Sequence, residues 1–109
     1  MSGIVGTSHS RSKVIAEKTD TAKAYGLCNG SGVLQNSYNV SSVTHPGSGG
    51  DFKFNFITAL GSQGYSAVSD CTANWKSAIN DWNNGYCQVL IRDESNNYSE
   101  PTYVSFIAF

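Results

Sequence analysis

Aromatic and amide side chains gather in the second half of this sequence in a pattern typical of sugar binding. An aromatic ring can stack on the C–H face of a sugar while neighbouring amides hydrogen-bond to its hydroxyl groups. The candidate ligand-binding residues are Trp75, Asn80, Trp82, Asn83, Tyr86 and Tyr98, with Asp81 and Asn84 as further polar partners. In the alternative interpretation both tryptophans fill the hydrophobic core. The sequence leaves both interpretations open.

Catalytic and metal-binding patterns are weak by comparison. His45 precedes a proline, and no Ser lies in the G-x-S-x-G context of a nucleophile elbow. The acidic residues are few and fall near turn signals, which argues against a glycosidase pair. Three cysteines without C-x-x-C spacing do not suggest a zinc site. We therefore expect a protein that is not an enzyme and needs no cofactor and no metal.

The cysteines Cys28, Cys71 and Cys87 are an odd number in a short chain. Each lies within an expected strand, so we expect the thiols to be small apolar core or strand residues made in a reducing cytoplasm. One disulfide among the three remains the alternative.

Charge and composition exclude several classes of function. The net charge is −1 and only 14% of the residues are charged, against about 25% in average globular chains. Such a balance gives no electrostatic basis for binding nucleic acid. No apolar run is long enough for a signal peptide or a membrane span, so we expect no membrane insertion. The abundance of Ser, Asn and Gly suits short strands and turns.

Apolar residues recur at every second position in several short segments, which predicts β-strands. The clearest case is the alternation of Phe52, Phe54 and Phe56 with polar residues. The expected strands span residues 24–28, 33–43, 52–57, 65–71, 86–92 and 103–109, with Tyr38 and Val40 on one face of the second. About six strands with short connections predict an all-β fold, an antiparallel β-sandwich or flattened barrel.

Residues 72–85 are ambiguous in sequence. Asn74 could cap a short helix that places Trp75 and Trp82 on one face, and the same residues also fit a strand. We expect a long excursion between two strands here.

The chain divides into an extended N-terminal arm, residues 1–20, and a β-sandwich domain, residues 21–109. The arm lacks a sustained period of either kind, so we expect it to dock on a partner surface. Its expected contact residues are Ile4, Val5, Arg11, Lys13, Val14 and Ile15. Residues 103–109 carry large apolar side chains on both faces, which calls for cover by a second subunit or by an internal loop.

The segment from Thr21 to Phe56 resembles the tip domains of phage tail fibres and head fibres, which read roughly T-A-K-A-W-x-x-F-x-G-x-G, S-x-N-V-S-S-I and G-x-Y-x-x-N-F. Tyr25 stands in place of the Trp of that pattern, and Cys28 lies close to its Phe. The matching residues are Thr21-Ala22-Lys23-Ala24, Asn29-Gly30, Gly32, Ser37, Asn39-Val40-Ser41-Ser42-Val43, Gly50 and Asn55-Phe56. The ending, Ile91-Arg92 with residues 103–109, resembles the closing hairpin of the same domains. The opening, residues 2–6 and 10–15, is similar to the N-termini of small virion proteins from phages, especially marine ones.

This resemblance implies a structural protein of the phage virion, made in the host cytoplasm. It would be a fibre-tip or attachment module that recognises the host surface, with a surface glycan as a candidate receptor. The arm would bind other virion proteins, and the domain would form a homo-oligomer, with a trimer favoured. A capsid or tail decoration protein that binds only virion proteins is the alternative, and a carbohydrate-binding module of a cellular protein is a third.

Overall fold

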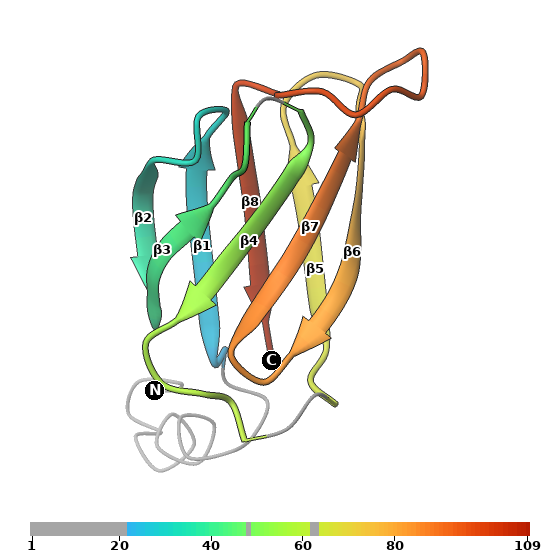
Figure 1. The fold of residues 1–109 in the computed structure, drawn as a ribbon. Coiled ribbons are helices and arrows are strands. Elements are labelled where there is room, and N and C mark those ends of the chain that lie inside the picture. Colours follow the sequence, from blue (N-terminus) through green and yellow to red (C-terminus); the bar gives the residue numbers. More distant parts are fainter. Residues whose placement is uncertain (1–21, 48, 62–63) are drawn as a thin grey trace, which may run out of the picture.

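The computed structural model describes residues 22–47, 49–61 and 64–109, and in these ranges every regular element is a β-strand. Eight strands form two four-stranded antiparallel sheets that face each other (Figure 1). The strands are β1 (Ala24–Asn29), β2 (Leu34–Tyr38), β3 (Val40–Thr44), β4 (Asp51–Phe56), β5 (Ala67–Cys71), β6 (Lys76–Asn83), β7 (Tyr86–Arg92) and β8 (Tyr103–Ala108). The predicted all-β sandwich is confirmed, with eight strands in place of about six.

The strand order is β2-β1-β8-β5 in one sheet, here called sheet A, and β3-β4-β7-β6 in the other, sheet B. Hairpins join β1 to β2, β3 to β4, and β6 to β7 within one sheet, whereas the other connections cross between sheets. The first and last strands pair side by side in the middle of sheet A, from Ala24 opposite Ala108 to Asn29 opposite Tyr103. The domain is therefore closed by its two terminal strands.

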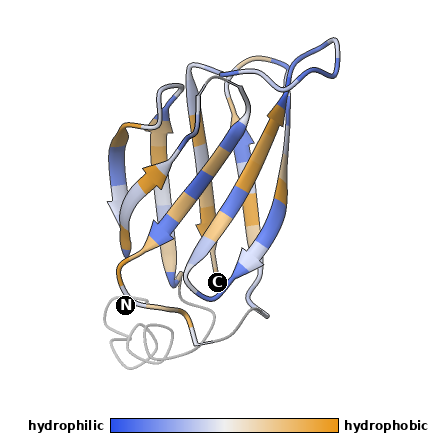
Figure 2. Cartoon of the chain, viewed as in Figure 1, coloured by the Kyte–Doolittle hydropathy of each residue, from blue (hydrophilic) through white to orange (hydrophobic). Residues whose placement is uncertain are grey.

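The core lies between the sheets and follows the alternation seen in the sequence. In β4, Phe52 and Phe54 are fully buried, and the residues between them face outward. The same pattern holds in β7 and β8, and Figure 2 shows the bands of alternating hydropathy along these strands. The buried residues of these two strands are Cys87, Val89, Ile91, Val104, Phe106 and Ala108.

A glycine in sheet A makes room for an aromatic contact that joins the two sheets across the core. The rings of Phe54 and Phe106 lie 4.6 Å apart, one from each sheet. A Cβ atom on Gly26 would come within 3.0 Å of the Phe54 ring and 3.3 Å of the Phe106 ring. Gly26 therefore allows the two rings to meet at the centre of β1.

The predicted strand 33–43 is two strands in two different sheets. Asn39 separates them with a φ of 58°, a left-handed conformation that Asn tolerates better than most residues. This reversal of the backbone sends β2 into sheet A and β3 into sheet B. Tyr38 is consequently exposed and Val40 buried, so the prediction that they share a face is wrong.

The predicted excursion at residues 72–85 is also wrong, because most of it forms β6. β6 and β7 make a hairpin whose register shifts between Ile79 and Asp81, so that Asn80 is an extra residue. Such a bulge breaks the period of two, which hid the strand in the sequence. In place of a helix at Asn74, the chain turns sharply at Ala73, whose φ is 69°.

The predicted arm and its contact residues, Ile4 to Ile15, lie outside the described residues.

Candidate functional site

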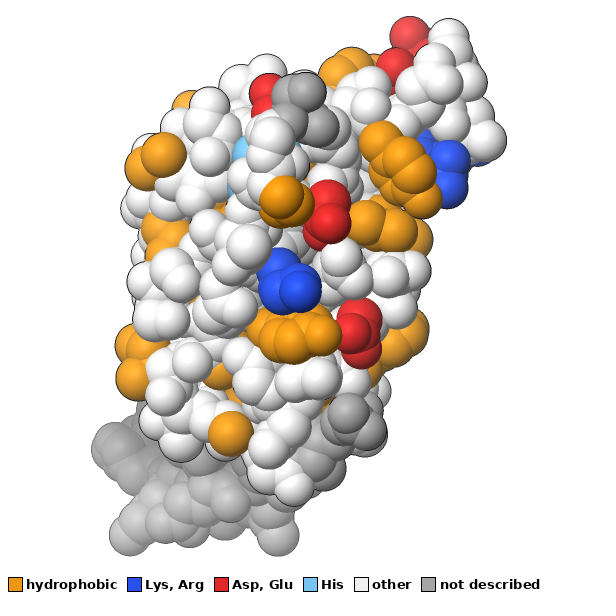
Figure 3. Space-filling view, viewed as in Figure 1, with side chains coloured by type: hydrophobic (Ala, Val, Ile, Leu, Met, Phe, Trp, Pro, Cys, Tyr) orange, Lys and Arg blue, Asp and Glu red, His pale blue; other side chains and the backbone are white. Residues whose placement is uncertain are grey.

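The outer face of sheet B is polar and charged. Because the buried residues of β4 and β7 point inward, the residues between them line the outside, namely Asp51, Lys53, Asn55, Tyr86, Gln88, Leu90 and Arg92. Figure 3 shows this face, on which acidic and basic side chains lie among apolar ones. The most distinctive groups on it are three side chains joined by hydrogen bonds.

Asp51, Gln88 and Asn80 form a hydrogen-bonded chain across β4, β7 and β6. Gln88 Nε2 donates to Asp51 Oδ1 at 2.7 Å, and Asn80 Nδ2 donates to Gln88 Oε1 at 2.8 Å. A carboxylate only accepts hydrogen bonds, so Asp51 fixes the orientation of Gln88 and thereby that of Asn80. Within the described ranges, Asp51 Oδ2 and Asn80 Oδ1 have no hydrogen-bond partner. The hydrogen-bonded chain of side chains thus presents a fixed acceptor at each end, Asp51 Oδ2 and Asn80 Oδ1.

A bulge in β6 lies at the Asn80 end of this hydrogen-bonded chain. Ile79 lies opposite Val89 and Asp81 lies opposite Gln88, so the inserted Asn80 shares the position beside Gln88. Regular pairing beyond Ile79 would also set Asn80 opposite Gln88, but it would turn Asp81 inward. The extra residue instead sets Asp81 opposite Gln88 on the outer face, next to Asn80.

Tyr98 forms a wall beside this chain. Its side chain is 50% exposed, and the Arg92 guanidinium lies 4.1 Å from its ring centroid. Arg92 Nη2 also donates to the Tyr98 hydroxyl at 2.7 Å. These two contacts hold the ring in place at the edge of the sheet.

The loop that carries Tyr98 is held by Asp93. Its carboxylate accepts hydrogen bonds from the backbone N–H groups of Ser95 and Asn97 and from the Ser99 hydroxyl. The Asn97 backbone bond, followed by the Ser99 hydroxyl, lowers the pKa of Asp93. An ionised Asp93 therefore orders the loop at neutral pH.

Two adjoining hollows lie under Tyr98, with volumes of about 340 and 430 Å³. They share Asn80, Leu90 and Tyr98, so together they make one groove, here called the sheet B groove. One end contains Asp51 and Gln88, and the other contains Lys76 and Arg92. A groove with an aromatic wall, an apolar floor and fixed amide groups suits a hydroxyl-rich ligand.

A second polar set lies on the same face, one register step along the strands. Lys53 Nζ is 4.5 Å from the centroid of the Tyr86 ring, and the Tyr86 hydroxyl donates to Asp81 Oδ2 at 2.8 Å. This hydrogen bond is the main reason that the pKa of Tyr86 is raised. With its hydroxyl bonded and Lys53 over its ring, Tyr86 is a flanking residue of the groove.

The structure brings only part of the predicted binding set together. Asn80 and Tyr98 line the groove, and Tyr86 lies beside it. Trp75 packs against the hydrophobic core. Asn83 Oδ1 accepts from the Gly85 N–H in the β6–β7 turn. Trp82 lies on the edge strand β6, opposite the buried Cys87 of β7, and is 41% exposed.

Sequence reasoning missed Asp51, Gln88 and Leu90. All three are outward residues of strands whose alternation was recognised, so that alternation placed them on the outer face. What the sequence did not show is that β6 pairs with β7, which is the step that brings Asn80 next to Gln88.

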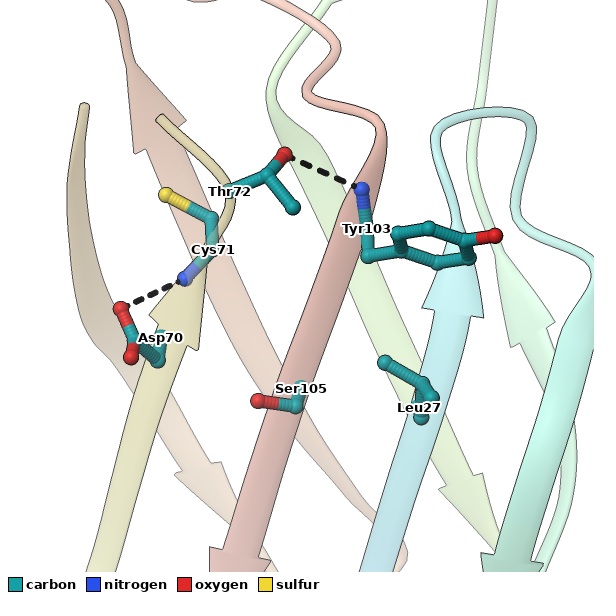
Figure 4. Close-up of a pocket in the computed structure, with 6 residues that line it drawn as sticks. All are labelled: Leu27, Asp70, Cys71, Thr72, Tyr103 and Ser105. Carbon is teal, nitrogen blue, oxygen red and sulfur yellow. Dashed lines mark hydrogen bonds between the residues drawn. The ribbon is translucent and has the colours of Figure 1, made fainter. Parts of the chain in front are cut away.

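A smaller hollow of about 200 Å³ lies on the outer face of sheet A, lined by Leu27, Asp70, Cys71, Thr72, Tyr103 and Ser105 (Figure 4). Burial, and then the charge of Asp70, raise the pKa of the Cys71 thiol. A thiol that resists ionisation is a poor nucleophile. The hollow therefore lacks an activated group and is better suited to contact than to chemistry.

Three further properties bear on function. In residues 22–47, 49–61 and 64–109 no group of three His, Cys, Asp or Glu side chains is placed to hold a metal ion. The same ranges contain no helix of the length and apolarity needed to cross a membrane. All three cysteines are free thiols.

Comparison of the chain with protein families, with curated proteins and with solved structures found no match.

Proposed function

We propose that this protein is an attachment module of a phage virion, and that the sheet B groove binds a saccharide of the host surface. The observation that carries the binding proposal is the hydrogen-bonded chain Asp51–Gln88–Asn80 beside Tyr98. The virion setting is supported by the resemblance of residues 21–56 to fibre-tip domains.

The groove fits a sugar ring for three physical reasons. Leu90 and the Tyr98 ring give an apolar surface for the C–H face of the ring. Asp51 Oδ2 and Asn80 Oδ1 can accept hydrogen bonds from hydroxyl groups. Because both acceptors are already oriented within the protein, a ligand loses less free energy in ordering them.

The proposal is tested by titrating the purified protein with neutral and acidic oligosaccharides of bacterial surface polysaccharides, using calorimetry and NMR. Tyr98→Ser should weaken binding about tenfold or more, which corresponds to loss of an aromatic contact worth about 1.4 kcal/mol. Asn80→Ala removes one hydrogen bond and should weaken binding about three- to tenfold.

The structure offers matched controls on the opposite sheet. Tyr38 is 55% exposed, close to the 50% of Tyr98, but lies on the outer face of sheet A. Asn36 is likewise exposed there. Tyr38→Ser and Asn36→Ala should leave the affinity per site unchanged. If no oligosaccharide binds, or if the control variants weaken binding as much, the groove is not a saccharide site.

The alternative role, a decoration protein that binds only virion proteins, predicts a different result. Deleting residues 1–20 should then abolish incorporation into particles, while Tyr98→Ser should leave both incorporation and adsorption to the host unchanged. An attachment module predicts that particles carrying Tyr98→Ser assemble but adsorb poorly.

A further inference from the structure

The two outer faces of the sandwich differ sharply in charge. On sheet B the outward strand residues include the charged Asp51, Lys53, Lys76, Asp81 and Arg92. On sheet A, among the described strand residues that face outward, Asp70 alone is charged. The remainder are largely aromatic or aliphatic: Tyr25, Leu27, Tyr38, Val68, Tyr103 and Ile107. Depletion of charge with enrichment in aromatic residues is typical of the centre of a protein interface.

Four of these side chains form a single row across all four strands. Tyr38 on β2 lies opposite Tyr25 on β1, Tyr25 opposite Ile107 on β8, and Ile107 opposite Val68 on β5. The two tyrosine rings stack with centroids 5.8 Å apart, and Tyr38 and Val68 are 55% and 60% exposed. The row therefore has an aromatic half and an aliphatic half.

We propose that a second copy of this chain packs on the outer face of sheet A about a two-fold axis that runs along the strands between β1 and β8. Such an axis sets β2 of one copy against β5 of the other, and β1 against β8. It places the large Tyr38 on the smaller Val68 and Tyr25 on Ile107, so that each aromatic half meets an aliphatic half. A row with this division in size is complementary to itself, as a two-fold interface requires.

The one charge on the face also fits this arrangement. Asp70 lies on β5 two residues after Val68 and on the same outer face. Its Oδ1 accepts from the Cys71 N–H at 2.8 Å. Its Oδ2 has no hydrogen-bond partner within the described part of the chain. It lines the hollow drawn in Figure 4, beside the place that the partner's Tyr38 would occupy. The phenolic hydroxyl of that tyrosine would donate a hydrogen bond to Asp70 Oδ2.

The size of the face sets the expected strength. Four strands about 4.8 Å apart and about 20 Å long give a face of about 400 Å² per copy. The total of about 800 Å² is below the roughly 1,200 Å² at which stable, specific interfaces begin, so the dimer should be weak and reversible, with a micromolar dissociation constant. The sheet B groove remains exposed on both outer surfaces of such a dimer. The inference does not depend on what the groove binds.

The test is sedimentation of the purified chain at loadings from about 5 µM to about 1 mM, a range chosen for a weak interface. The mass should rise from 11.7 kDa towards twice that value. Val68→Lys places a charge in the row and should weaken association at least tenfold. Ile57→Lys is the matched control, because Ile57 is 68% exposed but lies after β4, outside this face.

A mixed experiment tests the two-fold geometry itself. Tyr38→Glu alone and Val68→Lys alone should each associate at least tenfold more weakly than the unchanged chain, and circular dichroism should show both folded. Mixing them should restore association, because the glutamate of one chain then faces the lysine of the other while the second Tyr38–Val68 contact stays intact. Absence of self-association at the highest loading, a trimer, equal effects of Ile57→Lys and Val68→Lys, or no restoration on mixing would each overturn the proposal. Saccharide binding per site should be unchanged in these variants, so failure of the dimer and failure of the groove are separable.

Discussion

His45 Nε2 lies 2.7 Å from Glu100 Oε2, although 55 residues separate them in sequence. The other ring nitrogen, Nδ1, lies 2.8 Å from the backbone oxygen of Asp51, and the ring stacks on Phe52 with centroids 4.2 Å apart. Because a carbonyl only accepts, Nδ1 donates to the backbone oxygen of Asp51. A hydrogen bond between Nε2 and Glu100 Oε2 then requires a proton on one of these two groups. The imidazole thus ties the start of β4 to the segment that carries Tyr98.

Replacing this histidine should destabilise the fold. The His45 side chain is only 5% exposed, so His45→Ala leaves a gap over Phe52 and removes both hydrogen bonds. We expect a loss of about 2–4 kcal/mol in the free energy of unfolding, measured by urea denaturation. Glu100→Gln can still donate to Nε2 and should cost less than about 1 kcal/mol. Equal losses in the two variants would contradict this account, because they would mean that the contact with Glu100, and not the packing of His45 over Phe52, carries the stabilisation.

Acid should loosen the loop that carries Tyr98. The pKa of Asp93 is lowered, mainly by the Asn97 N–H and then by the Ser99 hydroxyl. A lowered folded-state pKa means that the stabilisation is fully present above the ordinary value of about 3.9 and is lost as the pH falls through the folded-state pKa. An NMR titration should give an Asp93 midpoint below the ordinary value, with the Ser95 and Asn97 amide signals moving at the same pH. A midpoint at or above that value would mean that the carboxylate does not order the loop.

The thiols should be almost inert in the folded protein. Burial raises the pKa of Cys28 to about 12 and that of Cys87 to about 11. Thiolates carry the reactivity, so an aromatic disulfide reagent at pH 8 should label only the partly exposed Cys71, and slowly. All three should react in urea, and Cys71→Ser should abolish the native reaction. Rapid labelling of two or more thiols without denaturant would contradict the buried positions of Cys28 and Cys87.

The same raised pKa values predict loss of stability in alkali. The folded state holds its thiol protons to a higher pH than the unfolded chain, whose thiols ionise near 9. Stability is therefore fully present below that pH and falls as the pH rises towards 11–12. Cys28→Ala should flatten this decline in urea titrations between pH 8 and 10. An unchanged slope would mean that Cys28 ionises as easily in the folded protein as in the unfolded chain.

The alternation of apolar residues predicted the core strands well and the crossing points poorly. Phe52 to Phe56, the buried face of β7 and the end of β8 follow strict alternation, and the β4–β7 and β1–β8 ladders that join these strands to their neighbours have no register shift. The bulge at Asn80 and the reversal at Asn39 each shift the pattern by one residue. A shift of one residue exchanges the two faces of a strand, so alternation alone gave the wrong face for Tyr38.

The candidate site was only partly predictable for the same reason. Aromatic and amide residues near the β6–β7 hairpin were recognised from their types, yet their use depends on which face each one occupies. Trp75 contributes to the core and Asn83 to a turn, whereas Gln88, an unremarkable residue in sequence, joins Asp51 to Asn80. Residue type indicated the chemistry of the groove, and strand pairing selected its members.

Asn39 gives the sharpest test of how the backbone passes from one sheet to the other. Its Nδ2 donates to the backbone oxygens of Lys23 and Thr58, and its Oδ1 accepts from the Thr58 N–H at 2.8 Å. Asn39→Gly keeps the left-handed backbone accessible but loses these bonds, and should cost about 1–3 kcal/mol in urea denaturation. Asn39→Val adds strain from a β-branched side chain at a φ of 58° and should cost at least about 1 kcal/mol more. Ser41→Val, on an exposed position of β3 two residues away, is the control and should change stability little. If the glycine and valine variants are equally stable, the left-handed conformation at Asn39 is not what directs β2 and β3 into different sheets.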